Sequence, residues 1–225
     1  IDMKLYQSDR APNPRRARMF MAEKGIDLNE IQALTFDVFG TVLDLAGSLT
    51  PCIAEFLQSR KTDLSADQCW SQWRARQRIE QYQDTIMMLG HSGYLETARR
   101  ALVHTLQSNH IEATTTEVDQ LMEAWMKLSP FPEVTEALER LGQRYRLVVL
   151  SNGNRYFLDH LVENRIEATF DEVVSVDVMG AFKPHPSVYR RTARILDLDV
   201  QQCLMVSANS FDVLGAKTCG LRAAF

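Results

Sequence analysis

The sequence has few of the features that mark membrane, zinc-binding or nucleic-acid-binding proteins. No apolar run approaches the roughly 20 residues of a membrane span, and no secretory hydrophobic region stands near the start. The five histidines are scattered, without the spacing of a zinc site. A net charge of −4 gives no basic field for nucleic acid or an anionic membrane. We therefore expect no nucleic-acid or membrane partner and no bound metal.

Cysteine is also scarce. The four cysteines form no C-x-x-C pair, so buried thiols in a reducing compartment are expected, and we place the protein in the cytoplasm. The composition is otherwise ordinary for a soluble globular protein, with 45% hydrophobic and 24% charged residues. A chain of 225 residues has room for one large domain, or for one domain with an insertion.

Short apolar runs alternate with helical segments over much of the chain. One buried strand leads up to Asp37, and further strands are predicted over 146–151, 172–176, 202–207 and 222–225. Helices are predicted between them, over 133–143, 154–164, 186–196 and 210–219. This alternation predicts an α/β fold: a Rossmann-like parallel sheet with helices on both faces.

The segment 47–129 is different because it contains no convincing strand. Its apolar residues have the spacing of amphipathic helices. We therefore expect an inserted helical cap over 47–129, with the core formed by 31–46 and 130–225.

Polar residues follow the predicted strands at the points where the strands end. They are Asp37 and Thr41, then Ser151 and Asn152, then Lys183, and finally Ser207, Asn209 and Asp212. Each alone is explained by ordinary turn or capping chemistry. Because the carboxyl ends of parallel strands meet at one edge of a sheet, all of them together predict a ligand site there.

These motifs resemble the haloacid dehalogenase superfamily, and residues 31–225 resemble its type II (S)-2-haloacid dehalogenases. The matching segments are 36–41 (FDVFGT), 150–153 (LSNG), 175–177 (SVD), 183–189 (KPHPSVY) and 206–212 (VSANSFD). Trp73-Arg74 stands where that group has a Trp-Arg pair. The resemblance therefore selects Arg74 over Arg76 and Arg78, between which spacing alone could not choose.

The resemblance implies a role for each strand-end residue. Asp37 would be the nucleophile that displaces halide, and Asp212 would accept a proton from water during ester hydrolysis. Thr41, Ser207 and Asn209 would position these groups, and Lys183 would supply positive charge. The substrate and its halide would be bound by Val38, Phe39, Arg74, Tyr94, Ser151, Asn152 and Phe211. No cofactor is implied, and a homodimer is left open.

Phe39 distinguishes this chain from most of the superfamily, which has a second Asp at that position as general acid and base. A phenyl ring cannot protonate a leaving alkoxide, so the leaving group should need no proton, as halide does not. Magnesium is disfavoured because Asp212 is the only acid in the fourth strand-end motif. A Mg²⁺-dependent phosphohydrolase is nevertheless the first alternative.

Residues 1–30 look like a separate piece. The run from Met3 to Ile26 resembles the first strand and helix of glutathione S-transferases, and Ser8 is the nearest match to the activating hydroxyl of that family. The later elements that hold glutathione are not found. A glutathione-binding or interaction module in 1–30 is the second alternative.

Overall fold

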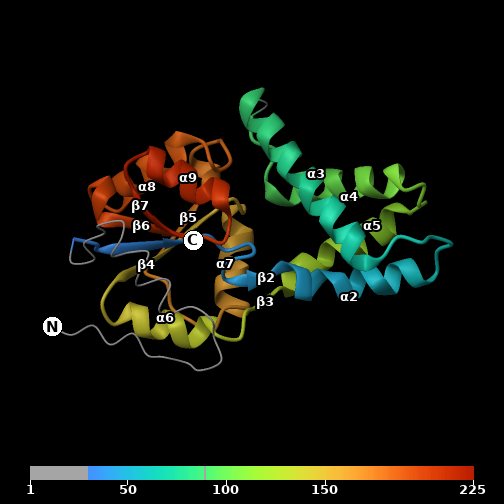
Figure 1. Cartoon of the computed structure of the whole chain (residues 1–225), viewed down its shortest axis with the longest axis horizontal. Coiled ribbons are helices and arrows are strands. Elements are labelled where there is room, and N and C mark those ends of the chain that lie inside the picture. Colours follow the sequence, from blue (N-terminus) through green and yellow to red (C-terminus); the bar gives the residue numbers. More distant parts are fainter. Residues whose placement is uncertain (1–29, 89) are drawn as a thin grey trace.

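The computed structural model describes residues 30–88 and 90–225 (Figure 1). The run from Met3 to Ile26 that resembles glutathione S-transferases lies outside the described residues. Within the described part, no helix is both long and apolar enough to cross a membrane.

The core of the described part is a five-stranded parallel sheet in the order β5–β4–β1–β6–β7. Its strands are β1 (Ala33–Phe36), β4 (Arg146–Ser151), β5 (Glu172–Ser175), β6 (Cys203–Val206) and β7 (Arg222–Ala224). All four residues of β1 are buried, as expected for a central strand covered on both faces. The predicted α/β fold is confirmed, and each predicted strand lies within two residues of the observed one.

The order of the strands makes β1 the switch point of the sheet. From β1 the chain continues to β4 and β5 on one side, then returns to β6 and β7 on the other. Parallel connections are right-handed, so this reversal places the later helices on the opposite face of the sheet. Figure 1 shows α8 (Pro186–Ile195) and α9 (Ser210–Thr218) together on one side. Ligands of such sheets bind where the direction reverses, at the end of β1.

The helices on the other face come directly before and directly after β4 in the chain. They are α6 (Val134–Gly142) and α7 (Arg155–Asn164), and α6 lies opposite α8 and α9 in Figure 1. Both match the predicted ranges within a residue.

Four further helices form a group beside the sheet, which we refer to as the helical unit (Figure 1). They are α2 (Leu45–Gln58), α3 (Ala66–Ile86), α4 (Tyr94–Ser108) and α5 (Thr115–Glu123). Capping boxes at Ser65 and Thr114 fix where α3 and α5 begin. A short antiparallel pair, β2 (Leu43–Asp44) with β3 (Ser129–Pro130), was not predicted, because two residues are too few to show an alternating pattern.

An aromatic cluster joins the helical unit to the sheet. The ring of Phe39 stacks on Tyr94 of α4, with centroids 4.1 Å apart and planes 12° apart. Trp125 meets both rings edge to face. Phe157 of α7 also stacks on Phe39, with ring centroids 5.6 Å apart. Offset aromatic pairs of this kind stabilise beyond their buried area. The cluster therefore holds the helical unit over the end of β1.

Candidate active site

Asp37 lies directly after β1, and its side chain is almost fully buried. Its backbone N–H donates to the carbonyl of Val206 at 3.0 Å, which fixes it against β6. The chain then turns sharply at Gly40, whose φ of +87° is in the left-handed region that favours glycine. The turn brings the hydroxyl of Thr41 back to donate to Oδ2 of Asp37 at 3.0 Å. The local sequence therefore presents Asp37 at the carboxyl edge of the sheet.

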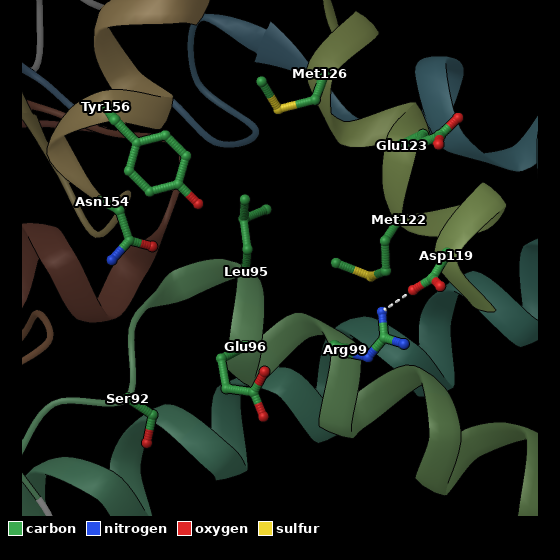
Figure 2. Close-up of a pocket in the computed structure, with 10 residues that line it drawn as sticks. All are labelled: Ser92, Leu95, Glu96, Arg99, Asp119, Met122, Glu123, Met126, Asn154 and Tyr156. Carbon is green, nitrogen blue, oxygen red and sulfur yellow. Dashed lines mark hydrogen bonds and ion pairs between the residues drawn. The ribbon is translucent and has the colours of Figure 1, made fainter. Parts of the chain in front are cut away.

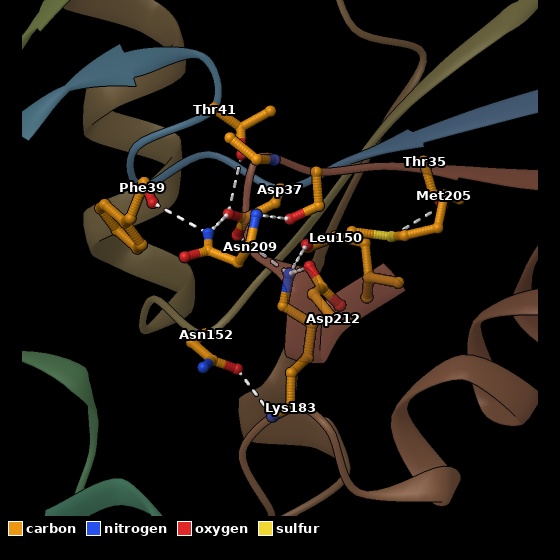
Figure 3. Close-up of polar contacts among 12 residues, drawn as sticks. Thr35, Asp37, Phe39, Thr41, Leu150, Asn152, Lys183, Met205, Asn209 and Asp212 are labelled. Atoms are coloured by element: carbon orange, nitrogen blue, oxygen red, sulfur yellow. Dashed lines mark hydrogen bonds and ion pairs between the residues drawn. The ribbon is translucent and has the colours of Figure 1, made fainter. Parts of the chain in front are cut away.

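Lys183 lies between the carboxylates of Asp37 and Asp212 (Figure 3). Its Nζ donates to Oδ1 of Asp37 at 2.9 Å, to Oδ2 of Asp212 at 2.7 Å and to the carbonyl of Leu150 at 2.8 Å. Burial alone would lower the pKa of the ammonium, but the two carboxylates outweigh burial and raise it. Lys183 is therefore charged, and all three of its donor positions are used.

Asp212 is held from its other side by a residue that the sequence analysis missed. The hydroxyl of Tyr189 in α8 donates to Oδ1 of Asp212 at 2.7 Å, and both side chains are fully buried. Burial raises the pKa of Asp212 against the opposing charge of Lys183, and burial also raises the pKa of Tyr189. Tyr189 ends the segment 183–189, but nothing in the sequence shows that α8 and α9 pack together.

Asn209 binds the same carboxylate oxygen as Thr41. Its Nδ2 donates to Oδ2 of Asp37 at 2.7 Å, and its backbone N–H donates to the hydroxyl of Ser207 at 3.1 Å. The structure thus brings Asn209 to Asp37, while Ser207 fixes the turn that carries Asn209. From the described residues Asp37 accepts three side-chain hydrogen bonds, and these fix the direction of both carboxylate oxygens.

Two arginines of α3 face the site, not one. Arg74 donates to Oε1 of Gln77 at 2.7 Å and to the hydroxyl of Tyr94 at 3.1 Å. Arg78 donates to Oδ1 of Asn209 at 3.2 Å, although the sequence analysis set it aside with Arg76. Residues four apart share a helix face and residues two apart do not, so Arg78 accompanies Arg74 while Arg76 does not.

Arg76 pairs instead with Glu80 of its own helix.

The remaining aromatic residues of the predicted set, Tyr94 and Phe211, line the region around Arg74 and Arg78. Burial raises the pKa of Tyr94 to about 12. Phe211 meets Tyr82 of α3 edge to face, with ring centroids 6.2 Å apart, and the guanidinium of Arg78 lies 5.8 Å from its ring centroid.

The end of β4 contributes Ser151 and Asn152, both buried. The hydroxyl of Ser151 has no hydrogen-bond partner among the described residues. Asn152 accepts from the backbone N–H of Lys183 at 2.8 Å, and its Nδ2 donates to Oε1 of Gln81 at 3.4 Å. A side chain at Gly153 would clash, since its Cβ would lie 2.7 Å from Leu158 and 3.1 Å from the ring of Phe39. Gln81, like Tyr189, was not anticipated from the sequence.

Val38 contributes backbone to the turn after Asp37. Its carbonyl accepts from the N–H groups of Val42 and Leu43 at 3.0 and 2.9 Å. These hydrogen bonds fix the turn and hold the backbone of Val38 and Phe39 at the carboxyl edge of the sheet.

A cavity of about 490 Å³ lies elsewhere, between α4, α5 and α7 (Figure 2). It is lined by Leu95, Met122, Met126 and Tyr156 together with charged side chains, among them the pair Arg99–Asp119. None of the site residues predicted from the sequence lines it, so it is distinct from the cluster around Asp37. Residues 30–88 and 90–225 contain no group of three or more His, Cys, Asp or Glu side chains arranged to hold a metal ion.

Known proteins with similar sequences and structures define the family. A model of the haloacid dehalogenase-like hydrolases matches residues 31–220. The sequence is 32% identical over 195 residues to haloacetate dehalogenase H-2 of Moraxella sp. (strain B), covering 86% of this chain and 84% of that protein. The fold defines an α/β protein with a parallel sheet, and the family model defines a hydrolase. The chain belongs, more narrowly, to the haloacid dehalogenase-like hydrolases.

Solved structures agree with this assignment. The L-2-haloacid dehalogenase from Xanthobacter autotrophicus superposes with a TM-score of 0.77 at 29% identity, over 86% of this chain and 76% of that one. The same enzyme with chloropropionic acid covalently bound gives a TM-score of 0.74 at 28% identity, with the same coverage.

Proposed function

We propose that this protein hydrolyses short 2-haloalkanoic acids to 2-hydroxy acids through a covalent ester of Asp37, without a metal. One observation carries the proposal. Asp37 is a buried carboxylate fixed by Lys183, Thr41 and Asn209, and the residue two positions later is Phe39, whose ring packs on Tyr94. This arrangement provides a nucleophile with no second carboxylic acid two residues later to protonate a leaving alkoxide, which suits a halide leaving group. The similarity to haloacid dehalogenases, one with a covalently bound acid, supports it.

In the first step, a carboxylate oxygen of Asp37 attacks C2 of the substrate and forms a C–O bond. The carbon–halogen bond breaks, and the halide leaves with its electron pair. Arg74 and Asn152 would donate to the departing halide. Ser151, whose buried hydroxyl has no hydrogen-bond partner in the described part of the chain, would donate to the substrate carboxylate together with the backbone N–H groups of Val38 and Phe39.

In the second step, water attacks the carbonyl carbon of the Asp37 ester while Asp212 takes its proton. The bond between this carbon and the substrate oxygen then breaks, and the 2-hydroxy acid leaves with a proton returned from Asp212. The raised pKa of Asp212 makes it a better base than an ordinary aspartate. The charge of Lys183 lowers the repulsion between an anionic substrate and an anionic nucleophile.

The two alternatives receive less support. A Mg²⁺-dependent phosphohydrolase needs a set of acidic ligands, whereas Lys183 lies between the two carboxylates of this site. The glutathione-binding alternative concerns residues outside the described part. A cytoplasmic location, a helical cap over 47–129 and the absence of nucleic-acid and membrane partners stand as parts of the proposal, with the homodimer left open.

Halide release from a substrate panel tests the proposed function. Chloroacetate, fluoroacetate and both enantiomers of 2-chloropropionate would be supplied to the protein, with p-nitrophenyl phosphate as the phosphatase control. We expect halide release with 2-hydroxy acid formed in equal amount, and inversion at C2 for the chiral substrate. Release of p-nitrophenol with no halide from any haloacid would overturn the proposal.

A further inference from the structure

Gln81 is a buried side chain of α3 that projects into the site with an unused donor. Its side chain is 3% exposed, and its Nε2 has no hydrogen-bond partner among the described residues. Its oxygen accepts from Nδ2 of Asn152, a residue at the end of β4. Gln81 therefore reaches from the helical unit to the carboxyl edge of the sheet.

A chain of hydrogen bonds fixes which end of the Gln81 amide is free. The backbone N–H of Lys183 can only donate, so Asn152 presents its oxygen to it, at 2.8 Å. The amide nitrogen of Asn152 consequently points toward Gln81. Two amide nitrogens cannot bond each other, so Gln81 presents its oxygen to Asn152. The NH₂ group of Gln81 is thus the free end.

A buried donor without an acceptor costs about 1–3 kcal/mol, and native structures rarely tolerate one without a reason. The NH₂ group of Gln81 is therefore suited to an acceptor that arrives with the substrate. Two such acceptors exist in a 2-haloacid, namely the carboxylate and the departing halide.

The position of Gln81 favours the halide. Among the described residues, Gln81 contacts the amide of Asn152, whereas the hydroxyl of Ser151, assigned above to the substrate carboxylate, has no hydrogen-bond partner. Gln81 also follows Arg74 by seven residues, close to two helical turns, which places both on one face of α3. Arg74 and Asn152 are the two residues assigned above to the halide.

We propose that Gln81 donates to the departing halide and completes the leaving-group site with Arg74 and Asn152. This inference rests on the proposed function and adds a residue that determines which carbon–halogen bonds are broken. As the bond from Asp37 to C2 forms, the halogen takes the electron pair of its bond to carbon. A donor fixed in place stabilises that developing charge without reorganisation.

The proposed role makes a graded prediction. The attraction between a donor and an anion grows as their separation falls, so the benefit is greatest for fluoride, smaller for chloride and smallest for bromide. A donor to the substrate carboxylate would instead affect all three substrates equally, because the carboxylate is the same in each.

The test compares Gln81→Met with the unaltered protein on fluoroacetate, chloroacetate and bromoacetate. Methionine keeps the length of the side chain and removes the donor. We expect kcat/KM for halide release from chloroacetate to fall about 10- to 100-fold, below the loss typical of an oxyanion-hole donor. The loss should be larger with fluoroacetate and smaller with bromoacetate. Gln83→Met, an exposed position on the same helix, is the matched control and should change none of the three.

Gln81→Glu provides a second variant, for use also if Gln81→Met does not fold. It retains an oxygen for Asn152 and replaces the donor with an acceptor. We therefore expect kcat/KM to fall in the same order across the three substrates, and by more than in Gln81→Met. An equal fall in kcat/KM on all three substrates, or no fall in either variant, would overturn this inference. Halide release by the unaltered protein would still uphold the proposed function. Absence of halide release by the unaltered protein would overturn both.

Discussion

The ammonium of Lys183 lies 2.7 Å from Oδ2 of Asp212, and the exposed fraction of each side chain is 1% or less. Removing one partner of a buried ion pair leaves the other charge uncompensated. Without Lys183, two buried carboxylates would lose their compensating charge, because the same ammonium also neutralises Asp37 at 2.9 Å. The centre of the site is therefore also a determinant of stability.

Lys183→Met should lower the free energy of unfolding by about 3–5 kcal/mol at pH 7. Urea denaturation measures it, with Lys61→Met, at an exposed position, as the control. The pKa of Lys183 is raised in the folded protein, so its stabilisation is present below the unfolded pKa of about 10.4 and is lost as pH rises through the folded value. The difference between variant and parent should therefore shrink only at strongly alkaline pH. A difference that disappears near neutrality would contradict this account.

Tyr189→Phe removes one hydrogen bond from Asp212 and leaves the aromatic packing in place. Because the lost bond favours the charged carboxylate, the pKa of Asp212 should rise further. In the proposed mechanism Asp212 acts as a base only when ionised, so the acidic limb of the kcat profile should move to higher pH. Measuring kcat from pH 4 to 9 tests this. Tyr156→Phe, on an exposed side chain, is the control, and identical profiles for both variants would exclude the role.

Arg74→Lys should slow halide release on the order of 100-fold, since a point charge replaces a planar set of donors. Arg76→Lys is the matched control on the same helix and should be nearly neutral, because Arg76 pairs with Glu80 away from Asp37. Steady-state kinetics with chloroacetate measure both. Equal losses of halide-release rate in the two variants would show that a different face of α3 lies toward Asp37.

Isotope labelling tests covalent catalysis directly. In a single turnover in H₂¹⁸O with protein in excess, the label should enter the carboxylate of Asp37, and the first 2-hydroxy acid should be unlabelled. Mass spectrometry of the peptide and the product measures both. Asp37→Asn should abolish turnover, whereas Asp212→Asn should release up to one halide per site and retain the ester. Label in the first product would falsify the ester and make Asp37 a general base.

Chelation separates this mechanism from that of a Mg²⁺-dependent phosphohydrolase. Halide release should survive prolonged treatment with EDTA, because the charge beside Asp37 is supplied by Lys183. The rate with and without added Mg²⁺ is the measurement. Activity that vanishes with EDTA and returns with Mg²⁺ would restore the phosphatase alternative.

The sequence by itself determined the sheet and the location of the site. Strands such as 146–151 are short runs of apolar residues, and their polar ends coincide with the carboxyl edge of a parallel sheet. The pattern is local, so it can be read without knowing how the elements pack. Lys183 and Asp212 were found in this way, although they are 29 residues apart.

Only the tertiary structure decided which side chains complete the site. Tyr189 reaches Asp212 because α8 packs on α9, and Gln81 reaches Asn152 because α3 lies over the end of β4. Arg78 joins Arg74 because the face that α3 turns toward Asp37 depends on how the helical unit docks. Docking is set by contacts such as Phe39 on Tyr94, between residues 55 positions apart by number, which no local pattern records. Local periodicity specifies each element, whereas the packing between elements specifies the site.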